Sequence, residues 1–165
     1  MKNSLWIIVT ASSLLLFSFS GKGFPAAKAK ADFSGNWKID LQKSDKAGSA
    51  PPVIKLTQTP DSLFIERVSA DGKSFVEKLS FDGKTFVSVT TSKRTKSGTA
   101  KWDAGGQSFT ETARLGEVGD PEKTAFNVTE HWTLSGDGKE VTVETDLSKS
   151  DGASFAMTAV YDKQP

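Results

Sequence analysis

Polar side chains interrupt runs of apolar residues at several points where the alternation of the sequence would otherwise be purely apolar. Each of them is two positions from an apolar residue, so in a β-strand they would share its face and point toward the interior. A charge in that place is costly unless it is paired, hydrated or in contact with a ligand. These interruptions are Arg67, Glu77, Glu111, Glu130 and Thr145.

Two interpretations of these residues remain open at this point. In the first, Arg67 together with Glu130 or Glu77 forms a polar pole that orients the head group of an amphiphilic ligand. In the second, the same residues lie near strand ends, in water or in structural salt bridges. A shift of one residue in register would turn each of them outward.

The sequence offers few groups for catalysis or metal binding. It has no Cys and one His, His131, which shares its parity with Asn127, Thr129 and Thr133 and is expected to face outward. A G-x-S-x-G nucleophile motif is absent, and the Asp-Gly pairs lack the spaced ligand series of a calcium loop. We therefore predict no enzyme activity, no metal and no cofactor; a carboxylate-only enzyme using Glu77, Glu111 and Glu130 is a minor alternative.

Frequent turn signals divide the chain into short segments of alternating residues. The clearest are the Asp-Gly pairs at 71–72, 82–83, 137–138 and 151–152, which tolerate the positive φ angles of tight hairpins. The pattern predicts ten antiparallel strands, at 35–42, 52–58, 62–69, 74–80, 85–91, 97–103, 107–114, 124–134, 140–148 and 154–161.

Closure of these strands into a barrel would remove the two exposed sheet edges. The predicted fold is thus all-β, an antiparallel up-and-down β-barrel of about 8–10 strands. Gly35 and Trp37 suit a first strand whose indole plugs one end of the barrel. The inward set is rich in aromatics, and the predicted ligand-binding residues are Arg67, Phe75, Glu77, Phe86, Phe109, Phe126, Glu130 and Trp132. Other positions predicted to face inward include Val53, Leu147 and Phe155.

Residues 1–31 have the layout of a signal peptide. Lys2 gives a positive start, 5–19 is nearly all apolar, and 21–31 is small and basic. The apolar run is shorter than the roughly 20 residues that span a bilayer, so we predict a helical leader that is cleaved, at 27–29, 29–31 or 18–20. The mature domain is then 32–165, in the periplasm or secreted.

The charge of the mature domain disfavours nucleic acid and anionic membranes as partners. Four of the 21 basic residues lie in the leader, leaving 17 against 20 acidic residues and a formal net charge of −3. The one basic cluster, Lys93, Arg94, Lys96 and Lys101, is interpreted as a solvated hairpin tip. We expect a monomer without stable membrane insertion.

The residues Phe33-Ser34-Gly35-Asn36-Trp37-Lys38, followed by Lys43-Ser44, resemble the N-terminal Gly-x-Trp signature of small exported bacterial lipocalin-like proteins. Residues 99–103, 130–135 with 137–139, and 160–164 of this chain also resemble segments found in that family. The resemblance implies a calycin-type barrel with a cup for small hydrophobic molecules. This chain departs from fatty-acid-binding proteins in lacking a helical lid, and from typical lipocalins in lacking a long C-terminal helix.

The sequence therefore predicts an exported protein that binds a small hydrophobic or amphiphilic molecule inside a barrel. The alternative is a filled barrel that acts as a structural or interaction module through its loops at 43–51, 92–96 and 115–123.

Overall fold

The computed structural model describes residues 29–91, 94–120, 125–149 and 151–165. The predicted leader helix, most of the leader and Lys93 lie outside these ranges. The described residues form ten strands: β1 (Gly35–Ile39), β2 (Val53–Gln58), β3 (Ser62–Val68), β4 (Ser74–Ser80), β5 (Phe86–Thr91), β6 (Arg94–Trp102), β7 (Ser108–Glu117), β8 (Phe126–Leu134), β9 (Glu140–Lys149) and β10 (Ser154–Lys163). In the same ranges a short 3₁₀ helix, η1 (Ala47–Ser49), lies between β1 and β2.

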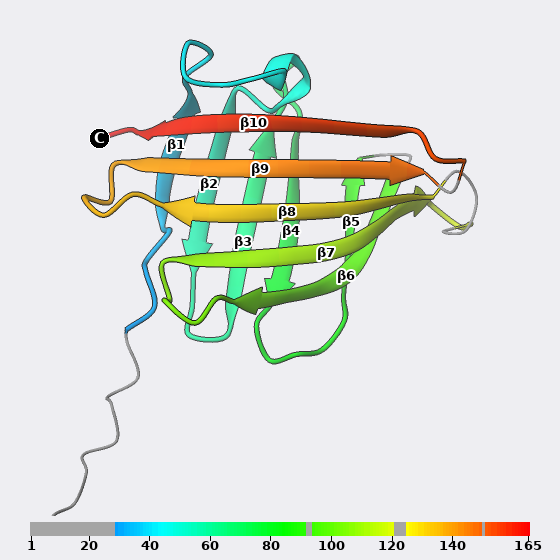
Figure 1. Cartoon of the computed structure of the whole chain (residues 1–165), viewed down its shortest axis with the longest axis horizontal. Helices are drawn as coiled ribbons and strands as arrows, with labels where there is room; N and C mark the ends of the chain where they lie inside the picture. The colour runs from blue at the N-terminus through cyan, green and yellow to red at the C-terminus, as the bar shows by residue number, and fades with distance from the viewer. Residues whose placement is uncertain (1–28, 92–93, 121–124, 150) are drawn as a thin grey trace, which may run out of the picture.

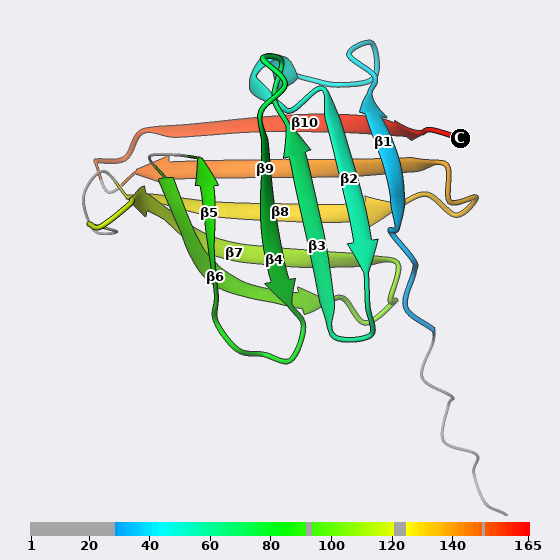
Figure 2. The ribbon, with the colours of Figure 1, turned by 180° about the vertical axis from the view of Figure 1, so that it is seen from behind.

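The strands form one antiparallel sheet in the order β4-β3-β2-β1-β10-β9-β8-β7-β6-β5. Only the β1–β10 pair joins strands that are not consecutive, so the chain follows an up-and-down path. Figure 1 shows β6–β10 crossing in front of β1–β5, and Figure 2 shows the same two layers from behind. The predicted all-β, up-and-down barrel of about 8–10 antiparallel strands is confirmed, and the observed barrel is nearly closed.

The strands β4 and β5 meet at the seam of the barrel without a main-chain ladder. They are nonetheless neighbours, because the backbone N–H of Lys78 on β4 donates to Ser88 Oγ on β5 at 3.1 Å. Ser88 is buried, with 7% of its surface exposed. At this point the hydroxyl of Ser88 therefore accepts the hydrogen bond that a backbone carbonyl would accept in a continuous ladder.

The alternation of apolar residues identifies the core in most strands, with corrections near strand ends. Leu63, Ile65 and Leu79 are fully buried as predicted. On β2 the predicted parity is wrong, because Ile54 and Leu56 are buried whereas Val53 is half-buried. The two adjacent apolar residues at the start of this strand conceal the alternation. At the β9–β10 hairpin, Leu147 is half-buried and its cross-strand partner Phe155 is 42% exposed, so neither lies in the core, contrary to the prediction.

One end of the barrel is covered by the segment that precedes β1. Trp37 is fully buried and donates from Nε1 to the carbonyl of Phe33 at 3.0 Å, as expected for an indole that plugs an end. The N–H of Ala31 donates to the carbonyl of Gly106 at 2.7 Å, and Gln58 Nε2 donates to the carbonyl of Ala31 at 2.8 Å. Residues 31–37 are thus fastened to β2 and to the β6–β7 turn.

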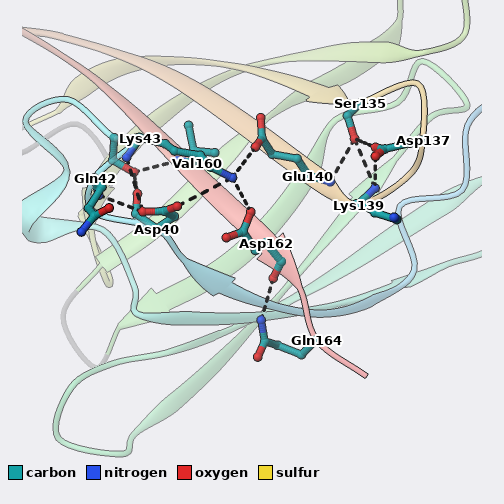
Figure 3. Close-up of polar contacts among 11 residues, drawn as sticks. Asp40, Gln42, Lys43, Ser135, Asp137, Lys139, Glu140, Val160, Asp162 and Gln164 are labelled. Carbon is teal, nitrogen blue, oxygen red and sulfur yellow. Dashed lines mark hydrogen bonds and ion pairs between the residues drawn. The ribbon is translucent and has the colours of Figure 1, made fainter.

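A group of surface salt bridges fastens the chain between β1 and η1 to the C-terminal strands. Lys43 Nζ lies 2.8 Å from Glu140 Oε2 on β9, 2.8 Å from Asp162 Oδ1 on β10 and 3.7 Å from Asp40 Oδ2 (Figure 3). The neighbouring Ser44 accepts from the N–H of Val160 at 2.9 Å. The loop at 43–51 is therefore tied down, and Ala47 within it is part of the core.

Candidate functional site: an ion cluster inside the barrel

Five charged side chains meet inside the barrel, and we call them the ion cluster: Arg67 (β3), Glu77 (β4), Lys96 (β6), Glu111 (β7) and Glu130 (β8). The register explains why they meet. Glu111 is the cross-strand partner of Glu130, and Glu130 is the partner of Thr145 on β9, so these three share one inward face. On β3 and β4 the ladder pairs Arg67 with Phe75 and Ile65 with Glu77, so Arg67 and Glu77 are diagonal neighbours on the same face.

Arg67 joins two carboxylates that come from different strands. Its Nε lies 2.7 Å from Glu77 Oε2 and its Nη2 lies 2.9 Å from Glu130 Oε2. The guanidinium also lies 5.5 Å from the centre of the Trp132 ring, whose Nε1 donates to Glu130 Oε2 at 3.1 Å. Both pairings proposed from the sequence, Arg67 with Glu77 and Arg67 with Glu130, are present.

Lys96 is the second cation of the cluster. Its Nζ lies 2.7 Å from Glu111 Oε1, 3.4 Å from Glu130 Oε2 and 3.6 Å from Glu77 Oε1. Its side chain is only 5% exposed. The prediction that Lys96 belongs to a solvated hairpin tip is therefore wrong.

The reason for this error is the position at which β6 begins. The strand starts at Arg94, three residues before the predicted start at 97. Lys96 then shares its parity with Ala100 and Trp102, which face the core. Extending the alternation backward from these two residues would have placed Lys96 inside.

Solvent reaches the members of the cluster unequally. The side chain of Arg67 is 21% exposed, whereas those of Glu130, Glu77 and Glu111 are 8%, 1% and 0% exposed. Arg67 therefore marks the side on which the cluster faces solvent. The carboxylate of Glu111 is the most deeply buried.

The environment separates the protonation of the two neighbouring glutamates. Burial raises the pKa of Glu111 to about 8, although Lys96 opposes the shift. Burial also disfavours the charge of Glu130, but Arg67 and Lys96 outweigh it and lower its pKa to about 2. For Lys96 and Arg67, the surrounding glutamates outweigh burial and raise the pKa. Near neutral pH Arg67 and Lys96 are thus cations, Glu130 is a carboxylate and Glu111 is protonated.

Three buried oxygen atoms of this face lack a hydrogen-bond partner: both carboxyl oxygens of Glu111, and Oγ1 of Thr145. Lys96 Nζ is close to Glu111 Oε1, yet no well-directed hydrogen bond reaches either oxygen. Thr145 is 3% exposed. Unpartnered buried polar atoms are uncommon and each calls for an explanation.

An aromatic cluster adjoins the ion cluster toward the end covered by residues 31–37, and consists of Phe33, Phe81, Trp102, Phe109 and Trp132. Phe109 lies at its centre, with ring centroids 5.2 Å from Phe33, 5.2 Å from Phe81, 5.6 Å from Trp102 and 5.6 Å from Trp132. Trp132 belongs to both regions, since its ring stacks on Phe109 while its Nε1 donates to Glu130.

The remaining aromatics predicted to line the site are placed differently. Phe86 is 6% exposed and belongs to the core. Phe75 and Phe126 are half-buried near strand ends. The Phe126 ring has the Lys149 ammonium 5.0 Å and the Arg94 guanidinium 5.9 Å from its centre. The structure therefore brings Arg67, Glu77, Glu130, Trp132 and Phe109 together, whereas Phe75 and Phe126 lie outside the core cluster.

A pocket of about 550 Å³ opens beside the aromatic cluster and includes Phe81 and Trp102 in its walls. Its volume is within the usual range for small-molecule sites. Lys30 and Lys101 also line it, and the Lys30 ammonium lies 5.5 Å from the Trp102 ring.

His131 lies on the outer face of β8, as predicted. It is part-exposed and its Nδ1 is 3.2 Å from Thr110 Oγ1. Within the described residues, no group of three or more His, Cys, Asp or Glu is placed to hold a metal ion. The same part of the chain has no helix with the length and apolar character needed to cross a membrane.

Comparison with known proteins gives a likeness of fold. No protein-family profile and no curated protein sequence matches the chain. Among solved structures, the zebrafish ileal bile acid-binding protein in complex with cholic acid is similar, with a TM-score of 0.57 and 12% sequence identity. The alignment covers 80% of this chain and 98% of that chain. At this level of identity the likeness concerns the calycin-type barrel, and it supports the coarser part of the resemblance noted in the sequence.

Proposed function

We propose that this protein binds a small amphiphilic molecule inside the barrel, with the polar group at the ion cluster and the apolar part against the aromatic cluster. The observation that carries the proposal is the ion cluster itself. Burying charged side chains opposes folding, and a well-packed apolar core would generally be as stable or more stable. We infer that a barrel with five ionisable side chains inside has a use for them beyond packing.

Two further observations support the proposal. Trp132 joins the polar and the apolar regions, so a ligand with one polar end would match both. The similar zebrafish protein has cholic acid, an amphiphilic molecule, in its complex. A calycin-type barrel is thus compatible with such a ligand.

We also propose that the protein acts without catalysis, as a monomer exported to the periplasm or beyond after removal of a leader. The composition of residues 1–31 supports the export. N-terminal sequencing of the protein from its host would test the cleavage.

The decisive experiment is native mass spectrometry of the protein purified from its own host, followed by denaturing extraction of anything bound. We expect a stoichiometric apolar or amphiphilic mass. The extracted protein should then bind the neutral fluorescent probe N-phenyl-1-naphthylamine with increased emission. Phe109→Leu, which preserves an apolar core side chain, should lower the affinity for this probe. Val87→Leu on the exposed face of β5 is the matched control and should leave the affinity unchanged.

A clean apo mass together with no uptake of the probe would contradict the proposal. It would favour the alternative, a filled barrel that acts through its loops.

A further inference from the structure

The arrangement of carboxylates inside the barrel indicates which polar group it suits. We propose that the ligand carries a positively charged amine, which binds between Glu111, Glu130 and Thr145, and that a carboxylate ligand is disfavoured. This inference rests on the proposed function, since it names the class of ligand for the same site.

The first argument is that the cations of the cluster are already engaged. Arg67 is shared by Glu77 and Glu130, and Lys96 lies within 3.6 Å of all three glutamates. A ligand carboxylate would have to displace one of these glutamates and leave it buried without its partner, which is strongly unfavourable. The cluster contains three acidic and two basic side chains, so no cation is in excess.

The second argument is that the atoms without partners are acceptors or able to accept. Glu111 Oε2 and the hydroxyl oxygen of Thr145 are buried and have no hydrogen-bond partner, whereas Glu111 Oε1 forms an ion pair with Lys96. An ammonium group has three N–H donors and no acceptor, so it can serve several oxygens at once. Glu130 lies between these two residues in the register, one strand from each.

The third argument concerns the direction of approach. Lys96 reaches the carboxylates from β6 and Arg67 reaches them from β3, while Glu77 faces them from β4. On the β9 side the inward neighbour of Glu130 is Thr145, which has no charge. An amine on this side therefore has Thr145 and the carboxyl groups of Glu130 and Glu111 as neighbours, and no basic side chain of β9 is paired with Glu130.

The charge balance then changes in a defined way. With an amine bound, loss of the Glu111 proton to solvent adds one negative charge to the cluster and balances the positive charge of the ligand. With a carboxylate bound, the cluster would hold an additional negative charge that only uptake of a further proton could offset. The ionisable side chain of Glu111 thus compensates a bound cation and not a bound anion.

The test compares three probes with the same chain: dodecylammonium, dodecanol and dodecanoate. Their dissociation constants are measured at pH 7 by displacement of N-phenyl-1-naphthylamine. We expect dodecylammonium to bind at least about tenfold more tightly than dodecanoate, the size of effect that one charge-assisted hydrogen bond supplies. Equal binding, or tighter binding of dodecanoate, would overturn the inference.

Two variants locate the amine. Glu111→Gln keeps the shape of the side chain and removes its charge, so the preference for dodecylammonium over dodecanol should fall to less than about threefold if a charged partner is needed. Thr145→Val keeps the volume and removes the unpartnered hydroxyl, so it should fold even if the first variant does not. Thr145→Val should raise the dissociation constant of dodecylammonium by about threefold or more, as the loss of one hydrogen bond predicts.

The control variant is Glu144→Gln. Glu144 is exposed on the outer face of β9 and lines a surface pocket of about 320 Å³ together with Asp45, Lys46 and Asp146. Thr145 also belongs to the wall of this pocket, but it is buried, so Glu144→Gln tests the surface side of β9 alone. We expect no change in the preference for dodecylammonium. If Glu144→Gln abolishes the preference while Glu111→Gln retains it, the amine binds at the surface and the inference is wrong.

The two levels of proposal fail differently. Binding of dodecanol and the naphthylamine without a preference for the amine would leave the proposed function standing and refute the inference. Absence of binding by every probe would refute both.

Discussion

The aromatic cluster and the ion cluster lie side by side in one barrel but are held together by different forces. Around Phe109 the contacts are apolar and nondirectional, so burial adds to stability and the loss of a side chain leaves a cavity. Around Arg67 and Lys96 the contacts are directional, and the cost of desolvating the charges offsets much of their attraction. The first region explains why the barrel is stable, whereas the second is expensive and calls for a functional explanation.

The largest effect on stability is expected from a substitution that disrupts the aromatic cluster. Replacing Phe109 by Ala should lower the free energy of unfolding by about 3–5 kcal/mol, because Phe109 is fully buried and contacts four aromatic rings. Chemical denaturation monitored by far-UV circular dichroism measures the change. A loss below about 1.5 kcal/mol would mean that the neighbours collapse into the space, and that this end of the barrel is less rigid than the packing indicates.

The next largest effect on stability is expected from a substitution that disrupts the ion cluster. Arg67→Met should lower the free energy of unfolding by about 2–3 kcal/mol, since it leaves Glu77 without its closest cation; the partial exposure of Arg67 reduces the loss. The double variant with Glu77→Leu should recover at least about 1 kcal/mol of this, because the unpaired buried charge is then removed. If the double variant is less stable than the single one, the pair contributes net stability and the contrast between the two regions is weaker.

A smaller effect is expected in the pH dependence of stability, which distinguishes Glu111 from Glu130. Because the pKa of Glu111 is about 8 in the folded protein and near 4.5 when unfolded, the folded state holds more protons between these values, and stability falls as the pH rises from about 4.5 to 8. Glu130 acts in the opposite sense: with its pKa lowered to about 2, it contributes stability that is lost as the pH falls from about 4.5 to 2.

Glu111→Gln should therefore remove the decline toward pH 8. Between pH 5 and pH 8 we expect the unfolding free energy of the original protein to fall by at least about 1 kcal/mol more than that of the variant, since one pKa unit corresponds to about 1.4 kcal/mol. Urea denaturation at each pH gives the comparison. Parallel pH profiles would show that Glu111 is ionised in the folded protein.

The same contrast explains how far the sequence could predict the structure. Apolar alternation is strong in β3, β4, β7 and β8, so Arg67, Glu77, Glu111 and Glu130 could be assigned to the interior from parity alone. It fails where the signal is ambiguous: adjacent Val53 and Ile54 are both apolar, and Lys96 precedes a small residue, Gly98, on its own face. The pairing of strands decides which charges meet, and a single sequence does not encode that directly.

The smallest expected effect comes from charges of the same kinds placed at the surface. The Lys43 ammonium is about half exposed and lies near Asp40, Glu140 and Asp162, so three acids surround one base here, whereas the ion cluster has three acids and two bases (Figure 3). Hydrogen bonds with Asp162 and Glu140 raise the pKa of Lys43. Water screens these contacts, so removing one partner leaves solvated carboxylates and no buried charge.

Lys43→Met should shift the urea midpoint less than Arg67→Met does, and the shift should shrink further in 0.5 M NaCl, because salt screens exposed charges more than buried ones. The shift of Arg67→Met should change little with salt, so the difference between the variants should widen. If instead both shifts shrank equally, ions would have free access to the ion cluster, and its contacts would then be as weak as those at the surface. The cost of burial that motivates the ligand would disappear with them, so salt dependence is a direct test of whether the interior charges need a functional reason.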